Sequence, residues 1–174
     1  MRIVLDTNVL VQVLRNAKRE VVLTDPATGN PLDRVEARAA ALIDQVDMNG
    51  DTALIPTPTL AEFLVGVNHS FYHTYLDAID SVSCFEVVSF DEISAMECAR
   101  LVDDAELKVL DPIATKAKVR FDRQILAIAI ANNAEELWTH DVGLYAKARQ
   151  CGLRVKSLAD IQPIPEQLQV DLGV

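Results

Sequence analysis

Apolar residues in this chain fall into short continuous runs and longer runs with helical spacing, and the two kinds alternate. Short apolar runs are typical of buried strands, whereas apolar residues three or four positions apart are typical of amphipathic helices. The predicted strands are residues 3–5, 53–55, 85–90, 136–139 and 153–158. Because helical segments separate them, the pattern predicts an α/β fold with a central, mostly parallel, twisted sheet of four to five strands.

Helix boundaries are predicted from capping and turn-forming residues. Asp33 and Asp91 are the predicted caps of two amphipathic helices. Residues 112–120 are predicted to form a connector, so that the strongly apolar helix after it opens at Phe121-Asp122. A carboxylate at that position is stabilised by the helix dipole.

The length of 174 residues suits one domain with a sizeable core. We predict a domain over residues 1–158, which includes a loop-and-helix segment at 24–50, and a C-terminal extension over 159–174. Because the first strand is predicted to begin at residue 3, no signal peptide is expected, and no apolar run is long enough to predict a membrane span. The three cysteines are widely spaced, as expected of reduced core thiols in a cytoplasmic protein.

The net charge of −10 opposes binding to a polyanion, but the charge is unevenly distributed. Residues 116–156 hold eight basic and four acidic side chains, a balance of +4, so the rest of the chain sums to −14. A nucleic acid held on one face is compatible with this segment, and an ordinary solvated surface explains the counts equally well. Residues 77–111 hold ten acids and two bases, which suits solvent or the basic surface of a partner.

Four acidic residues stand where predicted strands meet helices. Asp6 and Asp141 end strands, whereas Glu62 and Asp122 lie early in helices. Asp6 has an ordinary explanation as a helix cap, and Glu62 and Asp122 have one as favourable charges near a helix N-terminus. In an open parallel sheet, however, the strand-to-helix junctions share one edge, so all four can converge in one crevice. Converging carboxylates repel one another unless a cation lies between them, and hard oxygen ligands favour Mg²⁺ or Mn²⁺.

The segments around these acids resemble the four motifs of the PIN domain, a family of metal-dependent ribonucleases that includes the VapC-type toxins of toxin–antitoxin pairs. The resemblance spans residues 1 to about 158 and is carried by Leu5-Asp6-Thr7-Asn8-Val9-Leu10, Thr59-Leu60-Ala61-Glu62-Phe63, Phe121-Asp122-Arg123-Gln124-Ile125-Leu126-Ala127 and Trp138-Thr139-His140-Asp141. It implies a three-layer α/β/α fold. Two departures stand out: Arg123-Gln124 replaces the small and apolar residues that the family favours, and Val142-Gly143-Leu144 lacks the second acid of many members.

The resemblance implies a divalent-metal-dependent endoribonuclease that hydrolyses RNA phosphodiester bonds as the toxin of a type II toxin–antitoxin pair. An acidic quartet would bind Mg²⁺ or Mn²⁺ and carry catalysis: Asp6, Glu62, Asp122 and Asp141. Three polar residues would support it: Thr7, Asn8 and Thr139. Basic residues are expected to meet the RNA backbone: Lys116, Lys118, Arg120 and Arg123. The family also implies an antitoxin partner and a homodimer, for which the aromatic helix 69–79 offers a surface.

Other functions stay open at this point. A non-catalytic RNA- or protein-binding module, or a PIN nuclease of RNA processing outside a toxin–antitoxin pair, fits the same fold. Phosphotransfer with Asp6 as the nucleophile is disfavoured, because phosphatases of that type use an acid where Asn8 stands. His69 and His73 have the helical spacing of a metal pair, but only Asp77 offers a third ligand, so a packing role is favoured.

Overall fold

A sheet of five parallel strands forms the centre of the computed structural model, which describes residues 1–14, 22–101 and 115–163. Neighbouring strands pair in the order β3-β2-β1-β4-β5. The strands are β1 (Arg2–Leu5), β2 (Thr52–Pro56), β3 (Phe85–Val88), β4 (Glu136–Trp138) and β5 (Arg154–Lys156). The predicted α/β fold with a mostly parallel sheet of four to five strands is therefore confirmed.

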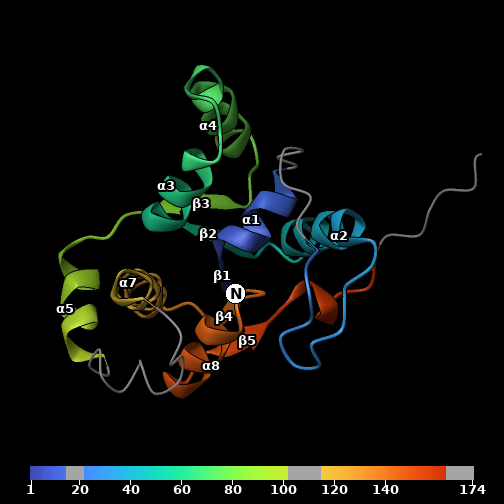
Figure 1. The fold of residues 1–174 in the computed structure, drawn as a ribbon. Coiled ribbons are helices and arrows are strands. Elements are labelled where there is room, and N and C mark those ends of the chain that lie inside the picture. Colours follow the sequence, from blue (N-terminus) through green and yellow to red (C-terminus); the bar gives the residue numbers. More distant parts are fainter. Residues whose placement is uncertain (15–21, 102–114, 164–174) are drawn as a thin grey trace, which may run out of the picture.

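Helices cover both faces of the sheet and give the molecule three layers (Figure 1). The helical segments are α1 (Thr7–Val13), α2 (Val35–Met48), α3 (Thr57–Val65), η1 (His69–Phe71), α4 (Tyr72–Asp80), α5 (Glu92–Arg100), α7 (Lys116–Ala131), α8 (Val142–Gln150) and η2 (Leu158–Asp160). α1 and α2 pack on one face, whereas α7 and α8 pack on the other, with α5 against α7. Within the described ranges, no helix is both long and apolar enough to cross a membrane.

The side chains of β1 explain why the sheet is buried on both faces. Ile3 and Leu5 point into the core shared with α2, and Val4 points into the core shared with α7 and α8. All three are at most 1% exposed, and burying an aliphatic side chain of this size stabilises a fold by about 1.5–3 kcal/mol. A strand buried on both faces is a continuous apolar run, which made this strand recognisable in the sequence.

Helix α7 begins earlier than the sequence predicts. It starts at Lys116, one residue after Thr115, whose hydroxyl accepts a hydrogen bond from the amide of Lys118 at 3.2 Å. The connector predicted for residues 112–120 is therefore wrong from Lys116 onward, and its first three residues lie outside the described part of the chain. Lys, Ala and Arg are good helix formers, so the basic run extends the helix. Asp122 consequently lies in the second turn of α7, not at its N-terminus.

The two predicted caps have different outcomes. Asp91 caps α5, since its Oδ1 accepts a hydrogen bond from the amide of Ser94 at 2.8 Å. The prediction for Asp33 is wrong, because Arg34 is the N-cap of α2 and has a left-handed backbone with φ of 48°. Asp33 instead forms an ion pair with Arg38 at 2.9 Å, and this pair competes with a capping role for its carboxylate.

Residues after β5 fold back onto α2. Leu158 of η2 and the nearby Ile161 are buried in the core that α2 covers. The guanidinium of Arg38 donates to the carbonyl of Ile161 at 2.6 Å. Residues 164–174 lie outside the described part of the chain, so the domain boundary at 158 and the extension over 159–174 stay predictions.

Candidate active site

The carboxyl ends of β1 and β4 form the topological switch point of the sheet. From β1 the strand order runs to β2 and β3 on one side, and to β4 and β5 on the other. In open parallel sheets the ligand crevice lies outside the carboxyl ends of the strands at such a point. Leu5 pairs with Trp138, so Asp6 and Thr139 emerge side by side. The amide of Asp6 donates to the carbonyl of Trp138 at 3.0 Å and secures this junction.

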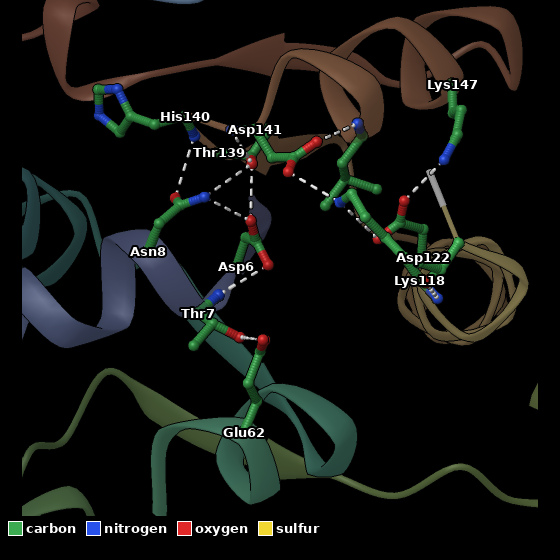
Figure 2. A network of polar contacts seen from close by, with 12 residues as sticks. Asp6, Thr7, Asn8, Glu62, Lys118, Asp122, Thr139, His140, Asp141 and Lys147 are labelled. Atoms are coloured by element: carbon green, nitrogen blue, oxygen red, sulfur yellow. Dashed lines mark hydrogen bonds and ion pairs between the residues drawn. The ribbon is translucent and has the colours of Figure 1, made fainter. Parts of the chain in front are cut away.

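Asp6 is a buried carboxylate whose hydrogen-bond donors are all uncharged in the described contacts (Figure 2). Its Oδ1 accepts from the amide of Thr7 at 2.7 Å, and its Oδ2 accepts from the Thr139 hydroxyl at 2.7 Å and the Asn8 amide at 2.8 Å. Burial raises the pKa of Asp6 to about 6; the bonds from Thr139 and Thr7 partly offset this rise, and nearby carboxylates add to it. Asp6 therefore lies where an added cation would be favourable.

Glu62 reaches the same site from α3. Its Oε2 accepts a hydrogen bond from the hydroxyl of Thr7 at 2.5 Å. The helix is anchored by Phe63, which is 1% exposed and packs in one apolar cluster with Ile55 of β2. The buried Phe63 holds the helix, and its neighbour Glu62 is thereby turned toward Thr7 and the carboxyl end of β1.

Asp141 caps α8 and also binds a lysine. Its Oδ1 accepts from the amide of Leu144 at 2.8 Å, and its Oδ2 accepts from the ammonium of Lys118 at 2.8 Å. Burial acts to raise the pKa of Asp141, but the hydrogen bonds from Lys118 and Leu144 outweigh it and hold the pKa below its ordinary value. Asp141 is therefore an ionised carboxylate that already has a positive partner.

Asp122 lies between two lysines on α7 and α8 (Figure 2). Its Oδ2 is 2.7 Å from Nζ of Lys147, and its Oδ1 is 3.5 Å from Nζ of Lys118. The Asp122 and Lys147 side chains are 4% and 0% exposed. Burial raises the pKa of Asp122, while the hydrogen bond from Lys147 and the charges of both lysines oppose that rise.

The four predicted acids line one cavity of about 500 Å³, a volume within the range of small-ligand sites. The remaining wall comes from α1, α7 and the loop before α2: Thr7, Asn8, Val11, Gln12, Leu23, Ala117, Lys118 and Phe121. The fold thus brings Asp6, Glu62, Asp122 and Asp141 to one cavity, while their catalytic and metal-binding roles stay predictions. Over residues 1–14, 22–101 and 115–163, no three His, Cys, Asp or Glu side chains are grouped closely enough to hold a metal ion.

The four basic residues predicted to meet RNA occupy different surroundings on α7. Lys116 and Arg120 are exposed and lie four residues apart, on one side of the helix. Lys118 faces the cavity, and Arg123 is half-buried. Contact with RNA by these side chains stays a prediction, and the exposed pair is the better placed for it.

Lys147 is a site residue that the sequence analysis missed. Lys147 lies on the buried side of α8, three residues after the buried Leu144 and one residue before the buried Ala148. The sequence did contain a signal for this residue. Lys147 stands where the helical spacing of apolar residues predicts a buried side chain, and a buried ammonium requires an acidic partner.

The sequence analysis also missed His140, whose ring and main-chain amide contact three other segments of the chain. Its Nδ1 lies 2.8 Å from the carbonyl of Thr24, and its Nε2 accepts from the amide of Leu158 at 3.1 Å. An accepting Nε2 requires the neutral ring protonated on Nδ1, and burial likewise lowers the pKa of His140. Its amide donates to Oδ1 of Asn8 at 3.0 Å. Two of these contacts involve main-chain atoms of distant segments, which leave no signal in residue spacing.

Comparisons with known proteins identify the fold. No family model matches the sequence, and the curated proteins contain no match to it. Among solved structures, a chain from the crystal structure of VapBC2 from Rickettsia felis, bound to a DNA fragment from their promoter, is 20% identical with a TM-score of 0.59. That match covers 90% of this chain and 98% of the other.

A second match is a chain from DNA-bound VapBC of Salmonella typhimurium, 16% identical with a TM-score of 0.55, covering 91% of this chain and 98% of the other. Together the two matches give this chain a PIN-like fold, which confirms the three-layer α/β/α architecture implied by the four motifs. More particularly, both similar chains come from VapBC structures, so the resemblance to VapC-type PIN domains holds for the fold.

Proposed function

We propose that this protein is a divalent-metal-dependent endoribonuclease that hydrolyses RNA phosphodiester bonds as the toxin of a type II toxin–antitoxin pair. The observation that carries the proposal is the cavity at the switch point of a PIN-like sheet, lined by Asp6, Glu62, Asp122 and Asp141. Packing alone gives no reason to place four carboxylates around one cavity, and a buried carboxylate such as that of Asp6 is costly without a positive partner.

The chemistry of these side chains fits Mg²⁺ or Mn²⁺, which prefer carboxylate oxygens. Asp6 would be the central ligand, because burial raises its pKa and it lacks a bonded positive group among the described contacts. Glu62, Asp122 and Asp141 would complete the set. A bound ion would supply polarisation of the phosphodiester and would favour loss of a proton from the attacking water.

The chain's own polar groups hold the acids in position. Thr139 and Asn8 hold Oδ2 of Asp6, and the hydroxyl of Thr7 holds Glu62. Such preorganisation means that little rearrangement is needed when charge develops in the reaction. On the RNA side, the exposed basic residues at the start of α7 would neutralise backbone phosphates.

The proposal includes an antitoxin partner and a homodimer. The chains of similar fold come from VapBC structures, and an acidic surface over residues 77–101 suits a basic partner. A self-association surface is offered at α3 and η1, where Val65 is 82% and Phe71 is 53% exposed. Light scattering should give twice the chain mass of 19.1 kDa, and the Val65→Asp/Phe71→Asp variant should give the single mass. A single mass for the unmodified chain contradicts the homodimer.

The deciding experiment is cleavage of a panel of structured RNAs with Mg²⁺, Mn²⁺ or EDTA. The Asp6→Asn and Glu62→Gln variants are compared with Asp44→Asn, which alters an exposed acid on α2 away from the cavity. Cuts at fixed positions are expected from the unmodified chain and from Asp44→Asn. Loss of a ligand to a catalytic metal should lower the rate by about 10²-fold or more in the other two variants.

Four outcomes would contradict parts of this proposal. Cleavage that survives in EDTA would contradict the metal requirement. Cleavage that survives in Asp6→Asn would contradict the site. Absence of cleavage together with absence of divalent-metal binding would favour a non-catalytic module. Cleavage by a protein that copurifies with no antitoxin, and that has none encoded beside it, would favour a role in RNA processing.

A further inference from the structure

The two lysines that contact the acidic quartet differ in burial. The side chain of Lys147 is 0% exposed and its Nζ lies 2.7 Å from Oδ2 of Asp122. The side chain of Lys118 is 36% exposed, and its Nζ lies 2.8 Å from Oδ2 of Asp141 and 3.5 Å from Oδ1 of Asp122. One ammonium is therefore buried in the protein, whereas the other lies at the wall of the cavity, and Figure 2 shows both lysines beside Asp122.

The oxygens that Lys118 contacts are those not used by their other partners. On Asp122, Oδ2 bonds to Lys147 and Oδ1 is left to Lys118. On Asp141, Oδ1 accepts from the amide of Leu144 and Oδ2 is left to Lys118. The ammonium of Lys118 therefore occupies the position between two carboxylates that a metal ion bound by both would take.

The difference in burial indicates which of the two lysines can move its ammonium away from the carboxylates. Moving the ammonium of Lys147 would deprive the buried carboxylate of Asp122 of its closest partner, and removing one partner of a buried ion pair costs about 3–5 kcal/mol. Lys118 lies in the first turn of α7 on a flexible four-carbon stem, and its ammonium can exchange the carboxylates for water. Because the Lys118 side chain is already 36% exposed, its ammonium is only partly desolvated, in contrast to that of Lys147.

We infer that Lys118 is a built-in counter-ion, which holds Asp122 and Asp141 together in the metal-free protein and must be displaced for a divalent cation to bind. The inference rests on the proposed metal-dependent function and adds a regulatory property to the same site. Lys118 lowers the affinity for the metal, so the site fills at a higher concentration of divalent ion than it would without this lysine. Lys147 stays in place in both states.

The first test is Mn²⁺ binding, measured by the electron paramagnetic resonance signal of free Mn²⁺ at constant ionic strength. The unmodified chain is compared with Lys118→Gln and with Lys116→Gln, which removes an exposed charge from the same helix turn. Loss of the competing ammonium should tighten binding by about tenfold or more in Lys118→Gln. A solvated and screened charge should matter little, so Lys116→Gln should change the affinity by less than about twofold.

The second test detects displacement directly, through acetylation of lysines by acetic anhydride followed by mass spectrometry. Lys118 should react faster when Mn²⁺ is saturating than in EDTA, because its ammonium has left the carboxylates. Lys147 should be protected in both conditions, and the exposed Lys116 should react equally in both. This readout does not depend on RNA cleavage.

The outcomes separate the two proposals. If Mn²⁺ binds the unmodified chain but Lys118→Gln binds it no more tightly, or if Mn²⁺ leaves the acetylation of Lys118 unchanged, the inference is overturned while the metal site stands. If neither the unmodified chain nor Lys118→Gln binds Mn²⁺, the inference falls together with the proposed metal dependence.

Discussion

The two halves of the acidic site hold their carboxylates by different means. Around Asp6, the described donors are the hydroxyl of Thr139, the side-chain amide of Asn8 and a main-chain amide. Around Asp122 and Asp141, the described donors include the ammonium groups of two lysines. Uncharged donors orient a buried carboxylate without neutralising it, whereas an ammonium does both. The Asp6 half therefore favours an added cation, and the other half already contains its own.

The contrast between Asp122 and Asp141 shows that burial matters as much as charge. The Asp122 side chain is 4% exposed and burial keeps its pKa raised, although Lys147 lies at 2.7 Å. The Asp141 side chain is 31% exposed, and there the hydrogen bonds from Lys118 and Leu144 prevail over burial and the pKa is lowered. In this site, the contacts with lysine outweigh burial at Asp141, the more exposed of the two carboxylates, and do not outweigh it at Asp122.

The largest expected effect comes from removing the buried lysine. Lys147→Met leaves the buried carboxylate of Asp122 without its closest partner, and such a loss costs about 3–5 kcal/mol of the free energy of unfolding. Lys147→Met/Asp122→Leu removes both charges and should recover most of that loss. Urea denaturation measures both, with Arg149→Met on the exposed side of α8 as the control. If Lys147→Met is as stable as the unmodified chain, the carboxylate of Asp122 does not depend on an ammonium partner, and the contrast with the Asp6 half of the site is contradicted.

A smaller effect of opposite sign is expected at Asp6. Its pKa in the folded protein, about 6, lies above the ordinary value of 3.8, so ionising it opposes folding by about 3 kcal/mol at neutral pH. Asp6→Asn should therefore be more stable than the unmodified chain by about 1–3 kcal/mol near pH 7.5 in EDTA. This gain in stability should shrink as the pH falls through 6. It should vanish below about 4, where the Asp6 carboxyl is protonated in both the folded and the unfolded protein.

Urea denaturation at several pH values checks this dependence, with the exposed-acid variant Asp44→Asn as a control that should show no such trend. Added Mg²⁺ should narrow the difference between Asp6→Asn and the unmodified chain, because a bound cation stabilises the ionised carboxylate. A difference that stays constant from pH 7.5 to 4 would mean that the Asp6 carboxylate is not destabilised by burial.

A third effect, similar in size to the one at Asp6 but of opposite sign, is expected at Thr139, which is 0% exposed. Thr139→Val keeps the shape of the side chain but removes the donor to Oδ2 of Asp6 and the acceptor for the amide of Asp141. Unmade buried hydrogen bonds of this kind cost about 1–3 kcal/mol. The pKa of Asp6 should also rise further, as a carboxyl ¹³C titration would show. Thr139→Ser retains the hydroxyl and should stay close to the unmodified chain in both measurements.

The sequence predicts those parts of the site that follow from the periodicity of strands and from their order. Asp6 was found because it interrupts an apolar run at once, and Thr139 lies beside it because β1 and β4 are neighbours. The start of α7 was misplaced, because a run of basic residues can be a loop or a solvated helix turn with equal ease. Only the packed structure shows that Lys118 turns inward while Lys116 turns outward.

Lys147 shows a different limit of prediction from sequence. A lysine on an apolar helix face signals a buried partner, but the pattern does not say which of the many acids in the chain it meets. That choice is made by the packing of α8 beside α7, which brings Asp122 within 2.7 Å although 25 residues separate the two in sequence. The local pattern therefore shows which side chain needs a charged partner, whereas tertiary packing determines which residue that partner is.

The hydrogen bond between Asp6 and Thr139 joins residues that are 133 positions apart, and this separation sets an order of events during synthesis. A ribosome that adds about 5–20 residues per second makes Thr139 roughly 7 to 27 s after Asp6. Strand β1 can pair with β2 well before β4 exists, but the cavity cannot be completed until β4 and the segment after it have been made. A chain cut short before residue 139 therefore carries Asp6 without the hydroxyl that holds it.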